Sequence, residues 1–139
     1  MMIYIASPYT SPDPSVMEDR YQKVRCFTAE GLRVGLVLFS PIVHCHPLAA
    51  AHNLPKDFAF WQTYSLAMID LAKMVLVLQL PGHETSRGVQ DEIQYCKEKN
   101  IPLWYWSVPT GAQYDFQDLC QRFWTIYMST QERKDALDK

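Results

Sequence analysis

The sequence predicts an α/β fold in which a mainly parallel β-sheet lies between two layers of helices. Short, wholly apolar segments alternate along the chain with longer segments whose apolar residues recur every three or four positions. The apolar segments lack the polar alternation of a strand with one face in water, so helices are expected to cover both of their faces. Ser-Pro or Pro-Gly pairs follow three of these segments, as turns between elements require.

The first strand is expected over Met2–Ala6, which is apolar and ends at a Ser-Pro turn. A helix follows over residues 15–34, where charged residues stand between apolar residues at helical spacing. Asp13 and Ser15 are both suited to cap its first turn, and Gly35 is suited to end it.

The middle of the chain repeats this order of elements. Leu36–Phe39 is wholly apolar and predicts the second strand. A short helix is expected near Leu48–His52. A longer helix is expected over Pro55–Lys73, with Pro55 in its first turn. Proline is tolerated there because backbone N–H groups of the first turn have no partner within the helix.

The last third predicts a strand over Met74–Leu80, a helix over Thr85–Lys99, a strand over Ile101–Trp106 and a final helix over Asp115–Asp138. Strands that alternate with helices in this way form a parallel sheet with right-handed crossovers. The predicted fold is therefore a Rossmann-like or flavodoxin-like three-layer sandwich. It has four or five strands and a C-terminal helix, in a single domain over residues 1–139.

The composition favours a small-molecule ligand. Of 139 residues, 48% are apolar and 20% are charged, and the net charge is -2. A weakly acidic chain is unsuited to a polymeric nucleic acid or an anionic membrane as its main partner. The N-terminus lacks the basic region of a signal peptide, and no apolar run reaches the roughly 20 residues of a membrane helix. A cytoplasmic location is therefore expected.

The cysteines and histidines do not predict a metal site. The four cysteines lie in separate segments without a CxxC pair, so reduced thiols are expected. His44 and His46 follow the second strand, and on an extended segment both would face one side. Neither Cys45 nor His52 completes a convincing set of ligands with them. We expect no metal and no cofactor, and we expect His44 to line a binding pocket, with a structural role as the alternative.

The stretch PGHETSRGVQDE, residues 81–92, carries the strongest chemical signal. Gly82 permits a sharp turn after the third strand, Ser86 can cap the next helix or bind an anion, and Gly88 lets a ligand approach the backbone. The positive end of the helix dipole favours phosphate at this place. Glu92 follows Ser86 by six residues, about 9 Å along the helix axis, so the two flank a space the size of a sugar.

Glu92 is predicted to lie beside the apolar stripe of its helix, about 60° from the centre of that stripe. A carboxylate at the margin of the core is partly desolvated, as a nucleophile or base needs. The alternative is a solvated glutamate without a catalytic role.

The motif L-P-G-x-x-x-S-x-G-V-x-x-E and the N-terminal I-Y-I-A-S-P-Y resemble the nucleoside 2-deoxyribosyltransferase superfamily, over residues 2 to about 105. The resemblance implies that Glu92 attacks the anomeric carbon of a deoxynucleoside or deoxynucleotide, and that water or a second base resolves the sugar ester. It implies that Ser86 and Gly88 contact the sugar or its 5′ group, and serine at this position favours a nucleotide. This is two-step substitution of the retaining glycosidase type.

The resemblance also places a second acid on the helix before the third strand, near Ser65, where this chain has none. Asp70 lies late in that helix and is expected to handle the proton of the leaving base, with Asp57 as an earlier acid. Ser7 and Tyr9 are implied to line the pocket for base and sugar, whereas Tyr4 is expected in the core.

Arg20 lies beside its helix stripe and is expected to reach a substrate phosphate, with a surface role as the alternative. The resemblance implies a homo-oligomer. Two other functions stay open: a nucleotide-binding module without catalysis, and a phosphoribohydrolase of the P-G-G-x-G-T-x-x-E type, whose second glycine and G-T pair this chain lacks.

Overall fold

The computed structural model describes residues 2–107, 121, 125, 129, 132 and 135–139. In this part of the chain, four strands form one sheet in the order β2-β1-β3-β4: β1 (Ile3–Ala6), β2 (Leu38–Phe39), β3 (Met74–Gln79) and β4 (Leu103–Ser107). Every neighbouring pair is parallel. The predicted α/β class with a parallel sheet is therefore confirmed.

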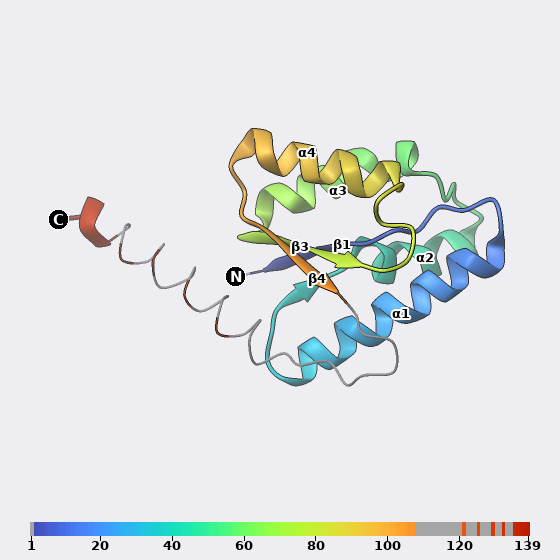
Figure 1. Cartoon of the computed structure of the whole chain (residues 1–139), viewed down its shortest axis with the longest axis horizontal. Coiled ribbons are helices and arrows are strands. Elements are labelled where there is room, and N and C mark those ends of the chain that lie inside the picture. The colour runs from blue at the N-terminus through green and yellow to red at the C-terminus, as the bar shows by residue number, and fades with distance from the viewer. Residues whose placement is uncertain (1, 108–120, 122–124, 126–128, 130–131, 133–134) are drawn as a thin grey trace.

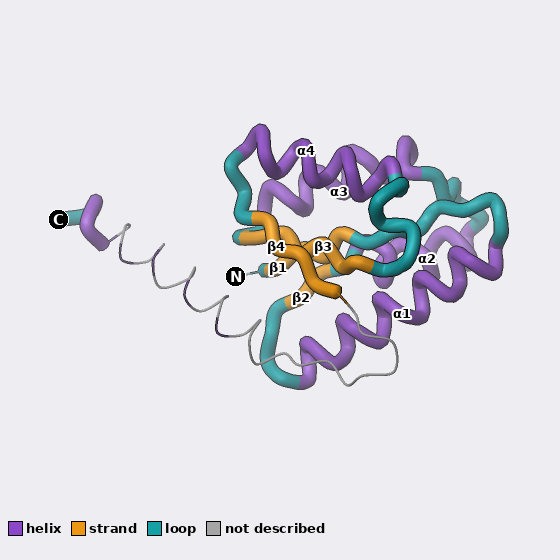
Figure 2. The backbone as a smooth tube through the Cα atoms, viewed as in Figure 1, coloured by secondary structure: helices purple, strands orange, loops and turns teal. Residues whose placement is uncertain are grey.

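Among the described residues, two helices cover each face of this sheet (Figure 1). One face carries α1 (Pro14–Arg33) and α2 (Pro41–His52), and the other carries α3 (Phe58–Leu71) and α4 (Arg87–Lys99). Figure 2 shows the strands between the two helical layers, which confirms the predicted three-layer sandwich. The helix predicted over Asp115–Asp138 lies largely outside the described residues. None of the helices in the described part of the chain is long and apolar enough to cross a membrane.

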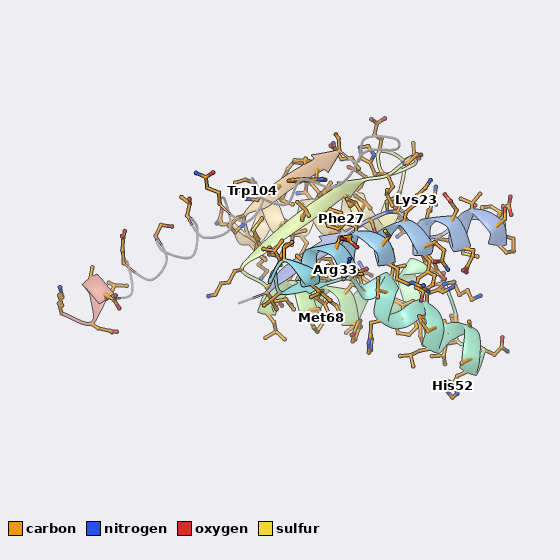
Figure 3. The ribbon with its side chains drawn as sticks, turned by 90° about the horizontal axis from the view of Figure 1, so that it is seen from below. Lys23, Phe27, Arg33, His52, Met68 and Trp104 are labelled. Carbon is orange, nitrogen blue, oxygen red and sulfur yellow. The ribbon has the colours of Figure 1, made fainter. Side chains whose placement is uncertain are left out.

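The central strands are buried on both faces, as their unbroken apolar sequences require. In β1, Ile3 and Ile5 pack with Phe27 of α1 on one face of the sheet, the face turned toward the viewer in Figure 3. Tyr4 and Ala6 alternate with them and pack on the opposite side against α3 and α4. A tyrosine hydroxyl is thereby brought to the α4 side of the sheet.

Side-chain caps decide where α1 and α3 begin. Asp13 caps α1, because its carboxylate accepts the N–H of Ser15 at 2.9 Å. Asp57 caps α3 and accepts the N–H of Phe60 at 3.0 Å, so α3 starts three residues later than predicted. The expectation that Pro55 lies in the first helical turn is wrong, because Pro55 precedes the cap.

The segment after β2 differs most from the prediction. Instead of an extended segment and a short helix near Leu48–His52, α2 is helical from Pro41 onward. Ser40 caps it, accepting the N–H of Val43 at 3.2 Å. The two histidines of this segment therefore lie on a helix.

The chain leaves β1 toward α1 and leaves β3 toward α4, on the opposite face. These two strands are neighbours in the sheet. Their carboxyl ends therefore form a topological switch point, where open α/β sheets bind ligands.

Candidate active site

A cavity of about 520 Å³ opens beside the switch point, within the size range of sites for small organic ligands. Loops that diverge from neighbouring strands leave a crevice at such a point. Four segments line the cavity: the loop after β1, the first half of α2, the start of α3 with the loop before it, and the start of α4. The residues are Ser7, Tyr9 and Thr10; Pro41, Ile42, Cys45 and His46; Lys56, Asp57, Ala59, Trp61 and Ser65; and Thr85, Ser86, Arg87, Gly88 and Glu92.

Glu92 places a buried carboxyl group in the wall of this cavity. It lies in the second turn of α4, and only 5% of its surface is exposed. The fully buried Tyr4 of β1 donates a hydrogen bond to Glu92 Oε1 at 2.6 Å. The structure thus buries Glu92 more deeply than the core margin expected for it, and gives Tyr4 a polar contact at the site as well as a place in the core.

The proton affinity of Glu92 is set by this burial. Loss of hydration raises the pKa of Glu92 from 4.5 to about 8, against the opposing effect of the Tyr4 hydrogen bond. Burial first, and then the charge of Glu92, raise the pKa of Tyr4 well above 10, so Tyr4 stays a hydrogen-bond donor. A carboxyl group that exchanges its proton near pH 8 inside a cavity is suited to nucleophilic or acid–base chemistry.

The first turn of α4 forms another part of the cavity wall. Ser86 caps the helix and accepts the N–H of Val89 at 3.3 Å, and Gly88 lies in the first turn. The positive end of the α4 dipole therefore faces the cavity. The cationic side chains of Lys56 and Arg87 also line it, and Arg87 is largely exposed beside Asp91. This end of the cavity suits an anion.

Two predicted residues from the loop after β1 line the cavity. Ser7 is buried, with 8% of its surface exposed, and within the described part of the chain its hydroxyl oxygen has no hydrogen-bond partner. A bound polar ligand would relieve that deficit. The Tyr9 hydroxyl is hydrogen-bonded to His46 Nδ1 at 2.5 Å.

The fold and cavity lie within a region that matches a known protein family. The family described as a domain of unknown function, DUF1937, matches residues 1–108. The chain belongs to this family. The matched region contains β1 to β4, α1 to α4 and every residue that lines the cavity. No curated protein matches the sequence.

The DUF1937 domain does not bring Asp70 to the cavity. Ser65, Trp61 and Ala59 line the cavity from the first half of α3, whereas Asp70 lies in the last turn. Asp70 is exposed and accepts a hydrogen bond from the Tyr95 hydroxyl at 2.6 Å. The helix axis carries Asp70 away from the carboxyl end of the sheet, so the geometry does not support its predicted role in proton transfer.

Arg20 and Gly82 lie behind the cavity wall. The Arg20 guanidinium donates hydrogen bonds to the carbonyl oxygens of Tyr9 at 3.2 Å and Thr10 at 2.9 Å. Gly82 has a φ of +96°, and a Cβ at this position would collide with Arg20 Nη2. Both residues line a separate cavity of about 260 Å³. Arg20 therefore holds the loop after β1, and the geometry does not support its predicted contact with a substrate phosphate.

His44 also lies outside the main cavity, and the expectation that it faces the same side as His46 is wrong. Residues two apart on an α-helix point roughly 200° apart. His44 is exposed and stacks on Tyr64, with ring centroids 6.0 Å apart. His52 lies at the far end of α2 (Figure 3). Within the described residues, no group of three His, Cys, Asp or Glu side chains is arranged to hold a metal ion.

Sequence reasoning considered both histidines but chose His44 instead of His46 for the pocket, and it did not assign Lys56 and Trp61 to the site. The Ser40-Pro41 pair was the signal for His46, because a serine cap before proline marks the start of a helix. From that start, the buried residues Ile42, Cys45 and Ala49 recur at helical spacing, and His46, whose side chain is 11% exposed, lies on the same side of α2. No local signal distinguishes Lys56 or Trp61 from ordinary loop and helix residues.

Proposed function

We propose that this domain cleaves or transfers the N-glycosidic bond of a nucleotide or nucleoside, with Glu92 as the nucleophile. The observation that carries the proposal is the buried Glu92 carboxyl group, bonded to Tyr4, in the wall of a cavity that also contains the start of α4. The resemblance of the Ser86–Glu92 motif to the nucleoside 2-deoxyribosyltransferases supports the same chemistry.

In the first step, a Glu92 oxygen forms a bond to C1′ of the sugar while the bond from C1′ to the base breaks. The electron pair of the broken bond leaves with the base. The Tyr4 hydrogen bond stabilises the attacking carboxylate. Forming an ester removes a charge from a buried position, so the burial that raises the pKa of Glu92 also favours the covalent intermediate.

The start of α4 is the part of the cavity best suited to the phosphate of a nucleotide. Ser86 and Gly88 lie there, and Lys56 and Arg87 add positive charge. Glu92 follows Ser86 by six residues, roughly 9 Å along the axis, which leaves room for a pentose between phosphate and nucleophile. We therefore propose a nucleoside monophosphate as the substrate class, with water or a second base as the acceptor.

The test is release of free base from a panel of deoxynucleosides and their 5′-monophosphates, followed by chromatography. We expect Glu92→Gln to lower the rate by at least ~10³-fold, as loss of a covalent nucleophile does. Glu98→Gln is the matched control, because it makes the same change at an exposed position of α4. Full turnover by Glu92→Gln would remove Glu92 from the mechanism.

A nucleotide-binding module without catalysis is the second candidate. It is favoured by the absence of a carboxylate at Ser65 and by the position of Asp70 outside the cavity. This candidate predicts that nucleoside monophosphates raise the melting temperature, following RT ln(1 + [L]/Kd), without release of base.

A further inference from the structure

Three side chains form a hydrogen-bonded row that ends at the cavity. His46 Nε2 lies 3.0 Å from Glu18 Oε2, and His46 Nδ1 lies 2.5 Å from the Tyr9 hydroxyl. Tyr9 and His46 both line the cavity, whereas Glu18 lies on α1 with half of its side chain exposed. The row therefore connects a carboxylate near the solvent with a phenol that a bound ligand can touch.

The His46 ring is held in place on several sides. Its side chain is only 11% exposed, and it stacks on Tyr21 with ring centroids 4.2 Å apart. Tyr9 meets it edge-on at 5.5 Å. A ring fixed in this way keeps both nitrogen atoms directed at their partners, as proton transfer requires.

The chemistry of the partners decides where protons lie in this row. Hydrogen bonds from Gln22 and His46 lower the pKa of Glu18, so this side chain is a carboxylate that only accepts. His46 Nε2 must then carry a proton. Nδ1 is then the nitrogen that exchanges a proton with Tyr9. It donates a proton when the imidazole is charged and accepts one when the imidazole is neutral.

We infer that Tyr9, His46 and Glu18 form a proton relay that protonates the leaving base and later removes a proton from the acceptor. This inference rests on the proposed function. Tyr9 is its catalytic residue, because it lines the cavity, and His46 and Glu18 act through Tyr9. The resemblance implies an acid near position 65 that handles the proton of the leaving base, and this chain has Ser65 there. The relay takes over that role.

In the first half-reaction, the Tyr9 hydroxyl gives its proton to the departing base as the C1′–N bond breaks, and the charged His46 returns a proton from Nδ1 to Tyr9. His46 becomes neutral and the sugar is esterified to Glu92. In the second half-reaction, water attacks C1′, its proton passes through Tyr9 to His46 Nδ1, and the electron pair of the ester bond returns to Glu92. The protein ends in its starting state.

Other acidic groups are less suited to this role. Tyr4 is committed to Glu92, and Asp57 accepts the N–H of Phe60 as the cap of α3. Apart from the members of the relay, the titratable and charged groups that act on Tyr9 and Glu18 are Cys45 of α2 and Arg25 of α1. Burial raises the pKa of Cys45 to about 11, so it remains a neutral thiol.

The test compares the purine monophosphate that the wild type cleaves fastest with its N7-methylated form. The methylated base is already cationic and leaves without a proton, whereas the unmodified base needs one. We expect Tyr9→Phe to lower turnover of the unmodified nucleotide by roughly 10²- to 10³-fold and of the methylated one by less than about 3-fold. Tyr64→Phe, which removes a hydroxyl outside the cavity, is the matched control.

His46→Ala should show the same selectivity, and added imidazole should restore part of the lost rate, which a purely structural role would not allow. In ¹⁵N spectra, His46 should carry a proton on Nε2 in the wild type and in Tyr9→Phe, which also reports that the variant is folded.

Equal losses on both nucleotides would overturn the relay while leaving the proposed function intact. A selective loss in Asp57→Asn instead of Tyr9→Phe would overturn it in favour of Asp57. A wild type that releases neither base contradicts the proposed function, and the relay with it.

Discussion

Glu92→Gln should stabilise the protein, and the gain should grow with pH. The folded protein holds the Glu92 proton up to a pKa of about 8, whereas the unfolded chain releases it near the ordinary value of 4.5. Between these two pH values the native state binds more protons than the unfolded state. The free energy of unfolding of the wild type therefore falls as the pH rises through this window, and the loss is complete above pH 8.

The size of the effect follows from the shift in pKa. A shift from 4.5 to about 8 corresponds to about 5 kcal/mol at 1.36 kcal/mol per pKa unit. Glutamine has nearly the same shape and does not ionise, so it removes this penalty. At pH 5 the Glu92 side chain is neutral in the folded state, and the variant and wild type should differ little.

Urea unfolding of wild type and Glu92→Gln between pH 5 and pH 9 measures the difference directly. Glu98→Gln is the control, because it makes the same substitution at an exposed position of the same helix. A difference that does not change with pH, or that favours the wild type at pH 9, would refute the view that Glu92 is a desolvated carboxyl group. The variant that stabilises the fold is also expected to abolish catalysis, since the proposed mechanism requires the buried charge.

Glu92, Tyr4 and Gly82 each allow a further measurement. The kcat/KM for the N7-methylated nucleotide, which needs no proton from the protein, should rise with pH by up to tenfold per pH unit and level off near pH 8, because Glu92 ionises there. A kcat/KM that falls as the pH rises toward 8 would contradict the role of Glu92 as nucleophile. Tyr4→Phe should raise the pKa of Glu92 further and lower kcat/KM at pH 7 by roughly tenfold or more, measured with the same substrate; an unchanged profile would show that the Tyr4 hydrogen bond is unimportant. Gly82→Ala should lower the free energy of unfolding, measured in urea, by about 1 to 3 kcal/mol. The loss should exceed that of Gly35→Ala, because both glycines have positive φ but only Gly82 lies against Arg20. Equal losses would indicate that Arg20 moves aside freely.

The sequence by itself determined the layers of the fold and the central part of the site. Its apolar runs and helical stripes predict the four strands of the described part of the chain and the positions of α1, α3 and α4, because these patterns depend on neighbouring residues in the chain. The same holds for Ser86, Gly88 and Glu92, which share one helix and whose spacing follows from its geometry. The helix α2 was largely missed, although its serine cap is a local signal that the histidine pair obscured.

Only the tertiary structure decided which side chains meet in the cavity. Tyr4 and Glu92 are separated by 88 residues, and Tyr9 and His46 by 37. No local pattern predicts such pairs, since they depend on strand order and on the side from which each helix approaches the sheet. The same long-range packing places Asp70 outside the site. It also removes water from Glu92, and desolvation is a property of the assembled layers that no single segment carries.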